Sequence, residues 1–223
     1  DAKDNELLTK VISLNYVTRL FATPGVLENL KPAALKSLKS VVTGGDVCRK
    51  DLVKKWADKV DFYNEYGPTE VTIAATAYLC KIDAVNALEL IPIGKPLKGI
   101  SIYILNSELQ PVDKGESGEI FIGGSRLARG YHNLVELTYT SFISNPFTTG
   151  EKLYKTGDIG KLLPSGDMVF LGRIDDQVKI DGYRIELGEI ENQVNQFEGI
   201  NQSFVLANNT SIGDKKMVVY YHA

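Results

Sequence analysis

The stretch "KSVVTGGDVCRKDLVKKWADKVDFYNEYG", from Lys39 to Gly67, decides the fold class. It opens with a short apolar run that Gly44 and Gly45 stop, as expected of a buried strand. Asp46 follows at a position suited to cap the helical segment "RKDLVKKWADK", and "VDFYNEYG" has the pattern of a second strand. This alternation of strand, helix and strand predicts an α/β layer with a substantially parallel sheet.

The same alternation continues towards the N-terminus. "NELLTKVISL" and "GVLENLKPAALKSL" have helical spacing, and "VTRLFAT" between them is typical of a short strand. After residue 90 the pattern changes to the short strands "ISIYILN", "GEIFIGG" and "DMVFLGR", with turn residues between them and one helix in "NLVELTYTSF". We expect the segment 91–174 to be β-rich and mostly antiparallel.

The C-terminal segment has a third pattern. "DQVKI" and "YRIEL" flank Asp181 and Gly182, which is a strong signal for a hairpin. An amphipathic helix in "LGEIENQVNQF" and two strands, "QSFVLAN" and "KKMVVYYHA", follow. The sequence therefore predicts an α/β sheet layer in 1–90, a β-rich lobe in 91–174 and a small α+β unit in 175–223.

Composition argues against several classes of function. No apolar run approaches the ~18 residues that span a bilayer, and the net charge of −3 comes from mixed signs, so we expect neither a membrane nor a nucleic-acid partner. The polar N-terminal stretch lacks a secretion signal, which predicts a cytoplasmic protein. Cys48 and Cys80 are expected to be reduced thiols, and the 2 histidines argue against a histidine metal site or a Ser-His-Asp triad.

The segment "YNEYGPTE", from Tyr63 to Glu70, offers groups that suit a nucleotide. A strand ends there in a turn with backbone N–H groups, and the Tyr66 ring can stack on a base. The Thr69 hydroxyl can donate to a phosphate, and the Glu70 carboxylate can hold a hard cation such as Mg²⁺. A Gly-Pro turn followed by a helix-capping threonine would explain the same residues without a ligand.

Three further segments carry polar residues or glycines of the same kind. "VVTGGD" lets a ligand approach the backbone closely, although the full G-x-G-x-x-G pattern is missing. "YKTGDIG" places Asp158 in a Gly-flanked turn, where a carboxylate can bind a ribose diol. "GGSRLARGY" puts Arg126 and Arg129 in a Gly-rich loop. Taken singly, each segment is more often a surface turn or a solvated loop than a site.

Together, "YNEYGPTE", "GEIFIGGSRLARGY", "LYKTGDIGKLLPSGDMVFLGR" and "IDDQVKIDGYRIELGEIE" occur in an order that resembles the amino-acid adenylation domains of nonribosomal peptide synthetases. The chain is similar, less closely, to the wider adenylate-forming superfamily of acyl-CoA synthetases and luciferases. The likeness runs from about Asn15 to the last residue. It implies a partial adenylate-forming α/β fold, with the C-terminal part of the large subdomain in 1–174 and an incomplete small C-terminal lid in 175–223.

The resemblance implies a two-step reaction in the parent protein, an ATP-dependent ligase of secondary-metabolite and antibiotic biosynthesis. ATP and an amino acid give an aminoacyl-adenylate and pyrophosphate, and the acyl group then passes to the phosphopantetheine thiol of a peptidyl carrier domain. Mg²⁺, backbone N–H groups and a cationic side chain would stabilise the charge at the α-phosphate. Neighbouring synthetase domains would be further partners.

Family roles in the adenine site carry over where the residues match. Asn64 and Tyr66 would contact the adenine, with Phe170 against the ring from the other side. Gly44 and Gly45 would line the face that the adenine and the substrate share. The resemblance thus implies an adenine site made from three stretches of the chain that are far apart in sequence.

The phosphate and ribose roles fall on four other residues. Thr69 would meet the α-phosphate, and Glu70 would bind Mg²⁺. Asp158 would bind the ribose hydroxyls, and Arg173 would assist there. The catalytic residues implied in this part of the chain are therefore Thr69 and Glu70.

The amino-acid pocket implied by the family is mainly apolar, of medium size, and has one carboxylate. Its lining would be Phe21, Val42, Gly44, Glu65, Ile73 and Ala74. Glu65 favours a substrate with a polar or hydrogen-bonding side chain, and both tyrosine-like and asparagine-like substrates fit this description.

The likeness also implies a lid that moves between the two half-reactions. Asp175 would be the hinge about which the small C-terminal subdomain rotates. Lys179, in the loop that follows, would take part in thiol transfer. Asp181 stands where the family most often has arginine, a charge reversal that would alter the contacts of this loop.

Two family elements would fall outside the sequence. The Ser/Thr/Gly-rich phosphate loop would precede Asp1 and the catalytic lysine would follow Ala223, so we expect the fragment alone to be inactive. A proteolytic or engineered fragment, a domain interrupted by an inserted tailoring domain, and a non-catalytic docking remnant each explain such a slice. An acyl-CoA ligase of the same fold is the alternative activity.

Overall fold

The structure is a computed structural model, which describes residues 4–175, 177–180, 182–209 and 215–223. The chain divides into two compact units, Asp1–Ile174 and Asp175–Ala223, and each is described by itself. The charge reversal expected at Asp181 lies outside the described residues.

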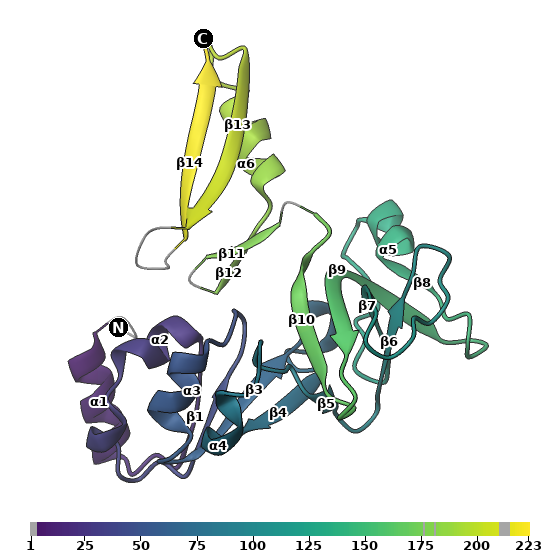
Figure 1. Ribbon diagram of the computed structural model, residues 1–223. Helices are drawn as coiled ribbons and strands as arrows, with labels where there is room; N and C mark the ends of the chain where they lie inside the picture. The colour runs from purple at the N-terminus through teal and green to yellow at the C-terminus, as the bar shows by residue number, and fades with distance from the viewer. Residues whose placement is uncertain (1–3, 176, 181, 210–214) are drawn as a thin grey trace. The chain divides into compact units, whose positions relative to one another are not determined.

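The first sheet of the N-terminal unit, sheet A, has five strands in the order β1-β2-β3-β4-β5. Its strands are β1 (Arg19–Ala22), β2 (Ser40–Thr43), β3 (Asp61–Tyr66), β4 (Thr76–Cys80) and β5 (Lys95–Pro96). The first three run parallel, whereas β4 and β5 pair with their neighbours in the antiparallel sense. The structure thus has the parallel α/β layer that the sequence predicts, extended by two antiparallel strands (Figure 1).

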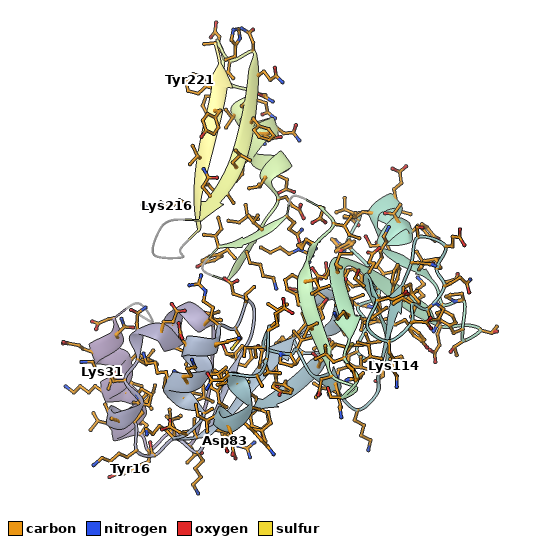
Figure 2. The ribbon with its side chains drawn as sticks, viewed as in Figure 1. Tyr16, Lys31, Asp83, Lys114, Lys216 and Tyr221 are labelled. Carbon is orange, nitrogen blue, oxygen red and sulfur yellow. The ribbon has the colours of Figure 1, made fainter. Side chains whose placement is uncertain are left out.

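The helices of the N-terminal half gather beside this sheet (Figure 1). They are α1 (Asn5–Leu14), α2 (Pro24–Asn29), α3 (Lys50–Trp56) and α4 (Ile82–Val85), with the 3₁₀ helices η1 (Pro32–Ala34) and η2 (Thr69–Val71). Side chains of α1 to α4 form one hydrophobic cluster with Val41 and Phe62 of the sheet. Trp56 is fully buried there, and its Nε1 donates to Leu27 O at 3.3 Å. Exposed side chains such as Lys31 and Asp83 project outwards from this layer (Figure 2).

Two local predictions for this half are wrong. The helix expected in "GVLENLKPAALKSL" is broken, because Pro32 forces Lys31 into extended backbone and α2 ends at Asn29. Asp46 does not cap α3, since the N-cap is Arg49 and the Asp46 Oδ1 accepts instead from the N–H of Val47 at 2.7 Å.

Both cysteines lie in the hydrophobic cluster below sheet A. Cys48 and Cys80 are buried, and neither forms a disulfide. Burial raises the pKa of the Cys80 thiol to about 12, so this side chain is a protonated core residue at neutral pH.

The second sheet, sheet B, is antiparallel, with the order β10-β9-β7-β6 and with β8 paired to β9. Its elements are β6 (Ile100–Leu105), β7 (Ser117–Gly124), α5 (Val135–Ser141), β8 (Phe142–Ser144), β9 (Lys152–Leu162) and β10 (Met168–Arg173). Ile120 and Ile122 pack into one cluster and Phe121 into another, so β7 is buried on both faces. The predicted β-rich, antiparallel lobe is present.

The turn predicted around Asp158 is wrong, because this residue lies inside the 11-residue strand β9. The flanking glycines serve sheet packing instead. A Cβ on Gly160 would lie 2.7 Å from Ile120 Cδ1, and Gly157 has a φ of +72°, which side chains other than glycine rarely adopt. Asp158 is therefore fixed by strand pairing.

Short hydrogen bonds join the two sheets. The N–H of Ile93 donates to Met168 O at 2.8 Å, and the N–H of Met168 donates to Gly94 O at 2.9 Å. One hydrophobic cluster spans the junction and includes Tyr66 from sheet A and Ile120 from sheet B. The end of β3 is thereby held against sheet B.

The described residues of the C-terminal unit form two antiparallel strand pairs and one helix. Its elements are β11 (Val178–Ile180), β12 (Tyr183–Ile185), α6 (Leu187–Val194), β13 (Gln202–Asn209) and β14 (Lys215–His222). Glu191 of α6 accepts from Val205 N at 2.8 Å through its carboxylate and from the Ser203 hydroxyl at 3.2 Å through its carbonyl. Across the described part of the chain, no helix is long and apolar enough to cross a membrane.

Candidate active site

The candidate site begins where the parallel strands β2 and β3 end, because such neighbours finish at the same edge of a sheet. Gly44 follows β2, and Gly67 follows β3. A Cβ on Gly44 would lie 3.0 Å from Glu65 O, and one on Gly67 would lie 2.6 Å from Ile73 O. Glycine at these positions lets three backbone segments touch at this edge.

Asp158 of β9 meets the end of β3 from the other sheet. The Tyr66 hydroxyl donates to Asp158 Oδ2 at 2.6 Å, and Arg173 Nη1 lies 2.5 Å from Oδ1. Asp158 and Tyr66 are 7% and 9% exposed. Burial, followed by the neighbouring carboxylate, raises the pKa of the Tyr66 hydroxyl well above its usual range, so it stays a donor.

A second layer of hydrogen bonds holds this pair in place. The Thr156 hydroxyl donates to Ile120 O at 2.6 Å and accepts from Asp158 N at 2.9 Å. Glu119 Oε1 accepts from the N–H of Gly157 at 2.9 Å, and partial burial raises the pKa of that carboxyl. The backbone on both sides of the Asp158 carboxylate is therefore fixed by β7.

Glu70 supplies a second buried carboxylate at this junction. It lies in η2, directly after the Gly67 turn, and is 7% exposed. The hydroxyl of Tyr131, in the loop after β7, donates to Glu70 Oε1 at 2.6 Å. The site thus has two carboxylates, and each accepts a tyrosine hydroxyl from the opposite half of the unit.

The loop after β7 is also tied to the segment that follows η2. The Thr72 hydroxyl donates to Arg126 O at 3.0 Å, and Arg126 Nη1 donates to Ala74 O at 3.3 Å. The N–H of Ala128 donates to Glu70 O at 2.8 Å. The Gly-rich loop that the sequence singled out is therefore a structural partner of the "YGPTE" turn.

Four of the predicted pocket residues lie on one face of sheet A. Phe21 pairs with Val42 and Val42 with Tyr63 in the parallel register, and residues two apart on a strand share a face. Gly44 and Glu65 therefore lie on the same face as Phe21 and Val42, opposite the hydrophobic cluster of the helices. Phe21 is 54% exposed on this face.

The other two predicted pocket residues lie elsewhere. Ile73 and Ala74 belong to the irregular segment after η2, where Ile73 has a φ of +75° and is 68% exposed. Burial raises the pKa of the half-buried Glu65 carboxyl, and the charge of Arg126 opposes this rise. The structure thus brings Glu65 near the same arginine that holds Ala74.

The predicted adenine contacts are only partly gathered. Phe170 of β10 packs against Tyr66 with ring centroids 6.3 Å apart and planes at 29°. Asn64 lies on the face opposite Glu65, is 4% exposed, and donates through Nδ2 to Pro92 O at 2.7 Å. Gly45 is exposed with a φ of +85°, beside the buried Gly44.

The roles assigned to Thr69 and to the lid residues Asp175 and Lys179 remain predictions. Thr69 is exposed at the first position of η2. Asp175 is the first residue of the C-terminal unit, and its Oδ1 accepts from Gln177 N at 3.3 Å. Lys179 pairs with Arg184 in the middle of β11, which confirms the predicted strand in "DQVKI", whereas the loop position that the family likeness implied for this residue is wrong. The residues gathered in the N-terminal unit do not include Asp175 or Lys179.

The motifs gave no role to several residues that build the site. Tyr131 is the last letter of the quoted motif "GGSRLARGY", so its position was available but its partner, 61 residues away, was not. Thr156 and Glu119 hold Asp158 through β9. No local pattern marks them, because the contacts that join β9 to β7, from Thr156 to Ile120 O and from Gly157 N to Glu119, link residues far apart in the sequence.

Comparison with known families decides the class of protein. The family model described as AMP-binding enzyme matches residues 1–132. The chain belongs to the AMP-binding enzyme family. The predicted resemblance is thereby confirmed for more than half of this AMP-binding chain.

Relatives of this AMP-binding chain include large peptide synthases. Tyrocidine synthase 1 of Brevibacillus parabrevis is 43% identical over 210 residues, which are 94% of the chain and 19% of that protein. Bacitracin synthase 3 of Bacillus licheniformis is 44% identical over 200 residues, which are 90% of the chain and 3% of that protein. The chain spans less than a fifth of these two relatives.

Solved structures confirm the fold class. Holo-PA1221, described as an NRPS protein containing adenylation and PCP domains bound to a vinylsulfonamide inhibitor, matches with a TM-score of 0.90 and 28% identity over 98% of the chain and 39% of that protein chain. The Vibrio cholerae adenylation domain AlmE, in complex with glycyl-adenosine-5'-phosphate, matches with a TM-score of 0.84 and 28% identity over 96% and 42%. The partial adenylate-forming fold predicted from the motifs is therefore present.

Proposed function

We propose that the chain is part of an amino-acid-activating adenylation domain in nonribosomal peptide synthesis. The whole domain would convert ATP and an amino acid into an aminoacyl-adenylate and pyrophosphate. The observation that carries the proposal is the pair of buried carboxylates, Asp158 and Glu70, held by tyrosine hydroxyls at the edge where the parallel strands end. Membership of the AMP-binding family and the similarity to peptide synthases support it.

The residues at this edge fit Mg²⁺ bound together with a nucleotide. Among the described residues, no group of three or more His, Cys, Asp or Glu side chains could hold a metal ion by itself. Mg²⁺ usually takes only one or two protein carboxylates and completes its shell with phosphate oxygens and water. Glu70 supplies one such carboxylate, so a phosphate-bound cation suits the site and an all-protein metal cage does not.

In the nucleotide site we assign the roles that the family likeness implies. Mg²⁺ would neutralise phosphate charge, with Glu70 as its ligand and the exposed Thr69 hydroxyl as a donor to the α-phosphate. Asp158 would accept from the ribose hydroxyls, with Arg173 holding the carboxylate in its orientation. Tyr66 would hold Asp158 from the other side.

The rest of the adenine site is assigned with the same reasoning. Asn64, Tyr66 and Phe170 would contact the adenine, and Gly44 and Gly45 would let it approach the backbone. The ring pair of Tyr66 and Phe170 supplies the apolar surface that a base needs.

The amino acid would bind on the uncovered face of sheet A. That face carries Phe21, Val42, Gly44 and Glu65, and Ile73 and Ala74 would close it from the turn after η2. Glu65 would select for a substrate side chain with hydrogen-bond donors.

The second half-reaction would need a carrier partner. Holo-PA1221 contains adenylation and PCP domains in one protein, which supports a peptidyl carrier domain with its phosphopantetheine arm as the partner. Asp175, at the start of the C-terminal unit, would act as the hinge, and Lys179 would serve thiol transfer. A cytoplasmic location stays a prediction.

Amino-acid-dependent pyrophosphate exchange tests this function, in the synthetase that carries this chain within a complete adenylation domain. We expect exchange with at least one amino acid, loss of exchange in Asp158→Ala and weaker exchange in Glu70→Ala. Asp158→Asn, which keeps the size of the side chain, separates lost chemistry from lost folding when its circular dichroism matches wild type. The proposal would be overturned if none of the amino acids tested supported exchange, or if the protein formed a thioester with free CoA.

A further inference from the structure

We propose that Tyr131 is a positioning residue that orients the Glu70 carboxylate for the divalent cation bound with the nucleotide. The inference rests on the proposed function, because that function assigns the cation to Glu70. It concerns the contact between a loop of sheet B and the turn after β3, which lie 61 residues apart in sequence.

The hydroxyl of Tyr131 is the group that acts. A phenol carries its proton at neutral pH, so it donates to Glu70 Oε1 across 2.6 Å, and it lies 3.4 Å from the Tyr154 hydroxyl. A donor on one carboxylate oxygen fixes the rotation of the whole group. A carboxylate held in this way binds a cation without first losing that rotational freedom.

The Tyr131 ring is held from the side by buried aromatic residues. It meets Phe142 edge-on, with centroids 5.6 Å apart and planes at 66°, and Phe142 packs against Tyr154 at 5.1 Å. Phe142 and Tyr154 are each 2% exposed. The ring therefore has a fixed place in the core, from which its hydroxyl reaches out to Glu70.

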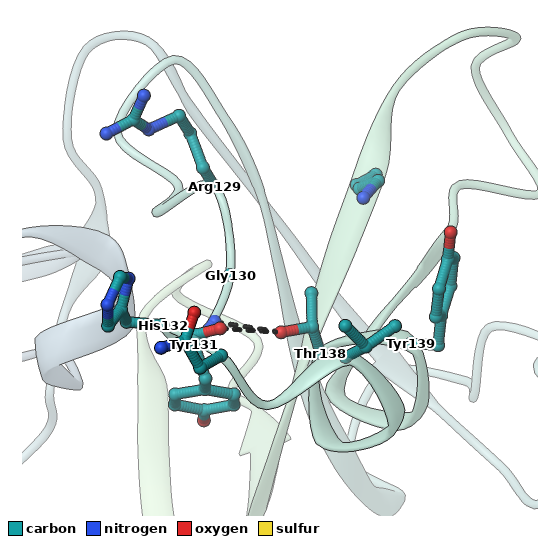
Figure 3. Close-up of a pocket in the computed structure, with 9 residues that line it drawn as sticks. Arg129, Gly130, Tyr131, His132, Thr138 and Tyr139 are labelled. Atoms are coloured by element: carbon teal, nitrogen blue, oxygen red, sulfur yellow. Dashed lines mark hydrogen bonds between the residues drawn. The ribbon is translucent and has the colours of Figure 1, made fainter.

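The backbone of Tyr131 is anchored to α5. Its N–H donates to Thr138 Oγ1 at 2.8 Å, as Figure 3 shows at the edge of an open hollow of about 550 Å³. Gly130 permits this contact, because a Cβ at that position would lie 2.3 Å from Thr138 Cγ2 and the residue has a φ of +145°. Tyr131 is thus fixed at both its ring and its main chain.

The same loop also fixes the main chain of Glu70. The N–H of Ala128 donates to Glu70 O at 2.8 Å, three residues before the tyrosine that holds the carboxylate. One short loop thereby sets both where the residue sits and how its carboxylate is turned. A contact that served folding alone would need to fix only the main chain of Glu70, not the orientation of its carboxylate.

Binding of Mn²⁺ with ATP, without amino acid, tests the inference on the complete adenylation domain. Electron paramagnetic resonance gives the Kd of the ion directly, so the readout does not depend on turnover. The variants are Tyr131→Phe, which removes only the hydroxyl, Glu70→Gln, which removes the charge, and Tyr139→Phe as the matched control. Tyr139 lies on α5 and is 73% exposed.

We expect Tyr131→Phe to raise the Kd of Mn²⁺ about tenfold, as loss of a group that orients a metal ligand commonly does. The Mg²⁺ concentration for half-maximal pyrophosphate exchange should rise by a similar factor, with a smaller change in the rate at saturating Mg²⁺. Glu70→Gln should raise the Kd of Mn²⁺ more than Tyr131→Phe does, and Tyr139→Phe should leave this Kd unchanged. Thr138→Val, which loosens the loop without touching the carboxylate, should raise the Kd by less than Tyr131→Phe does, because it acts on the carboxylate only through the loop.

The outcomes separate this inference from the proposed function. A wild-type Kd in Tyr131→Phe, with Glu70→Gln impaired, overturns the inference and leaves the function standing. A wild-type Kd in both variants removes Glu70 from the cation site and overturns the inference as well. If no amino acid supports exchange but Tyr131→Phe still weakens the binding of Mn²⁺, the proposed reaction fails while the positioning role holds.

Discussion

Two buried carboxylates of the N-terminal unit each accept a tyrosine hydroxyl at 2.6 Å, but the surrounding structure holds them differently. Asp158 lies inside an 11-residue strand and forms an ion pair with Arg173. Glu70 lies in a three-residue 3₁₀ helix and depends on a loop for its orientation. Changes around Asp158 should therefore appear first as lost stability, and changes around Glu70 first as a higher concentration of the divalent cation needed for binding.

Arg173→Ala should have the largest effect on stability. The substitution leaves the Asp158 carboxylate buried without its cation, which destabilises a fold by about 3 kcal/mol. Urea unfolding followed by circular dichroism measures the change. The matched control is Lys155→Ala, which removes an exposed ammonium group 3.8 Å from Glu119 and should lower the stability by less than about 1 kcal/mol. Equal losses of stability in the two variants would contradict the prediction that the buried Asp158 carboxylate depends on its ion pair with Arg173.

Tyr66→Phe should have the next largest effect, about 2 kcal/mol at pH 7, because it removes a hydrogen bond to a buried carboxylate. The pH dependence sharpens this test. Burial and Asp158 raise the pKa of folded Tyr66, so above about pH 10 the hydroxyl ionises first in the unfolded chain and stability falls. Wild type should therefore lose stability between about pH 9 and pH 11 more steeply than Tyr66→Phe. The prediction would be contradicted if the free energy of unfolding fell equally steeply with pH in the wild type and in Tyr66→Phe across this window.

Among the three substitutions at the two carboxylate sites, Thr138→Val should have the smallest effect on stability, about 1 kcal/mol, because it removes from α5 the oxygen that accepts from the Tyr131 N–H. Thermal unfolding gives this value, and the Kd of Mn²⁺ with ATP gives the effect on the site. The comparison would fail if Thr138→Val destabilised the protein as much as Arg173→Ala did and left Mn²⁺ binding unchanged.

Much of the fold was predictable where a single local pattern decides the structure. The spacing in "NELLTKVISL" marks α1 (Asn5–Leu14), and "ISIYILN" and "GEIFIGG" mark β6 and β7. The prediction failed where a distant partner decides. Asp158 is flanked by glycines, which locally indicate a turn, but Gly160 is there because Ile120 of β7 comes so close.

The sequence could name candidate residues for the site but not the contacts between them. "YNEYGPTE" named Tyr66 and Glu70 because their side chains suit a nucleotide and its cation. The Tyr131 hydroxyl reaches Glu70 of η2, and the Thr156 hydroxyl donates to Ile120 O of β7. These partners are distant in the sequence, so no local spacing encodes the contacts. A motif gives the chemistry of a side chain, whereas tertiary structure gives its orientation.

The two faces of sheet A have a consequence for how such a protein could acquire new substrates. The face that packs on the helices carries the stability, with Val41 and Phe62 fully buried. Phe21, Val42 and Glu65 stand on the opposite face, outside that hydrophobic cluster. Under the proposed function, replacing them would change the pocket and leave the core intact, so selectivity could drift or be redesigned with little penalty to folding.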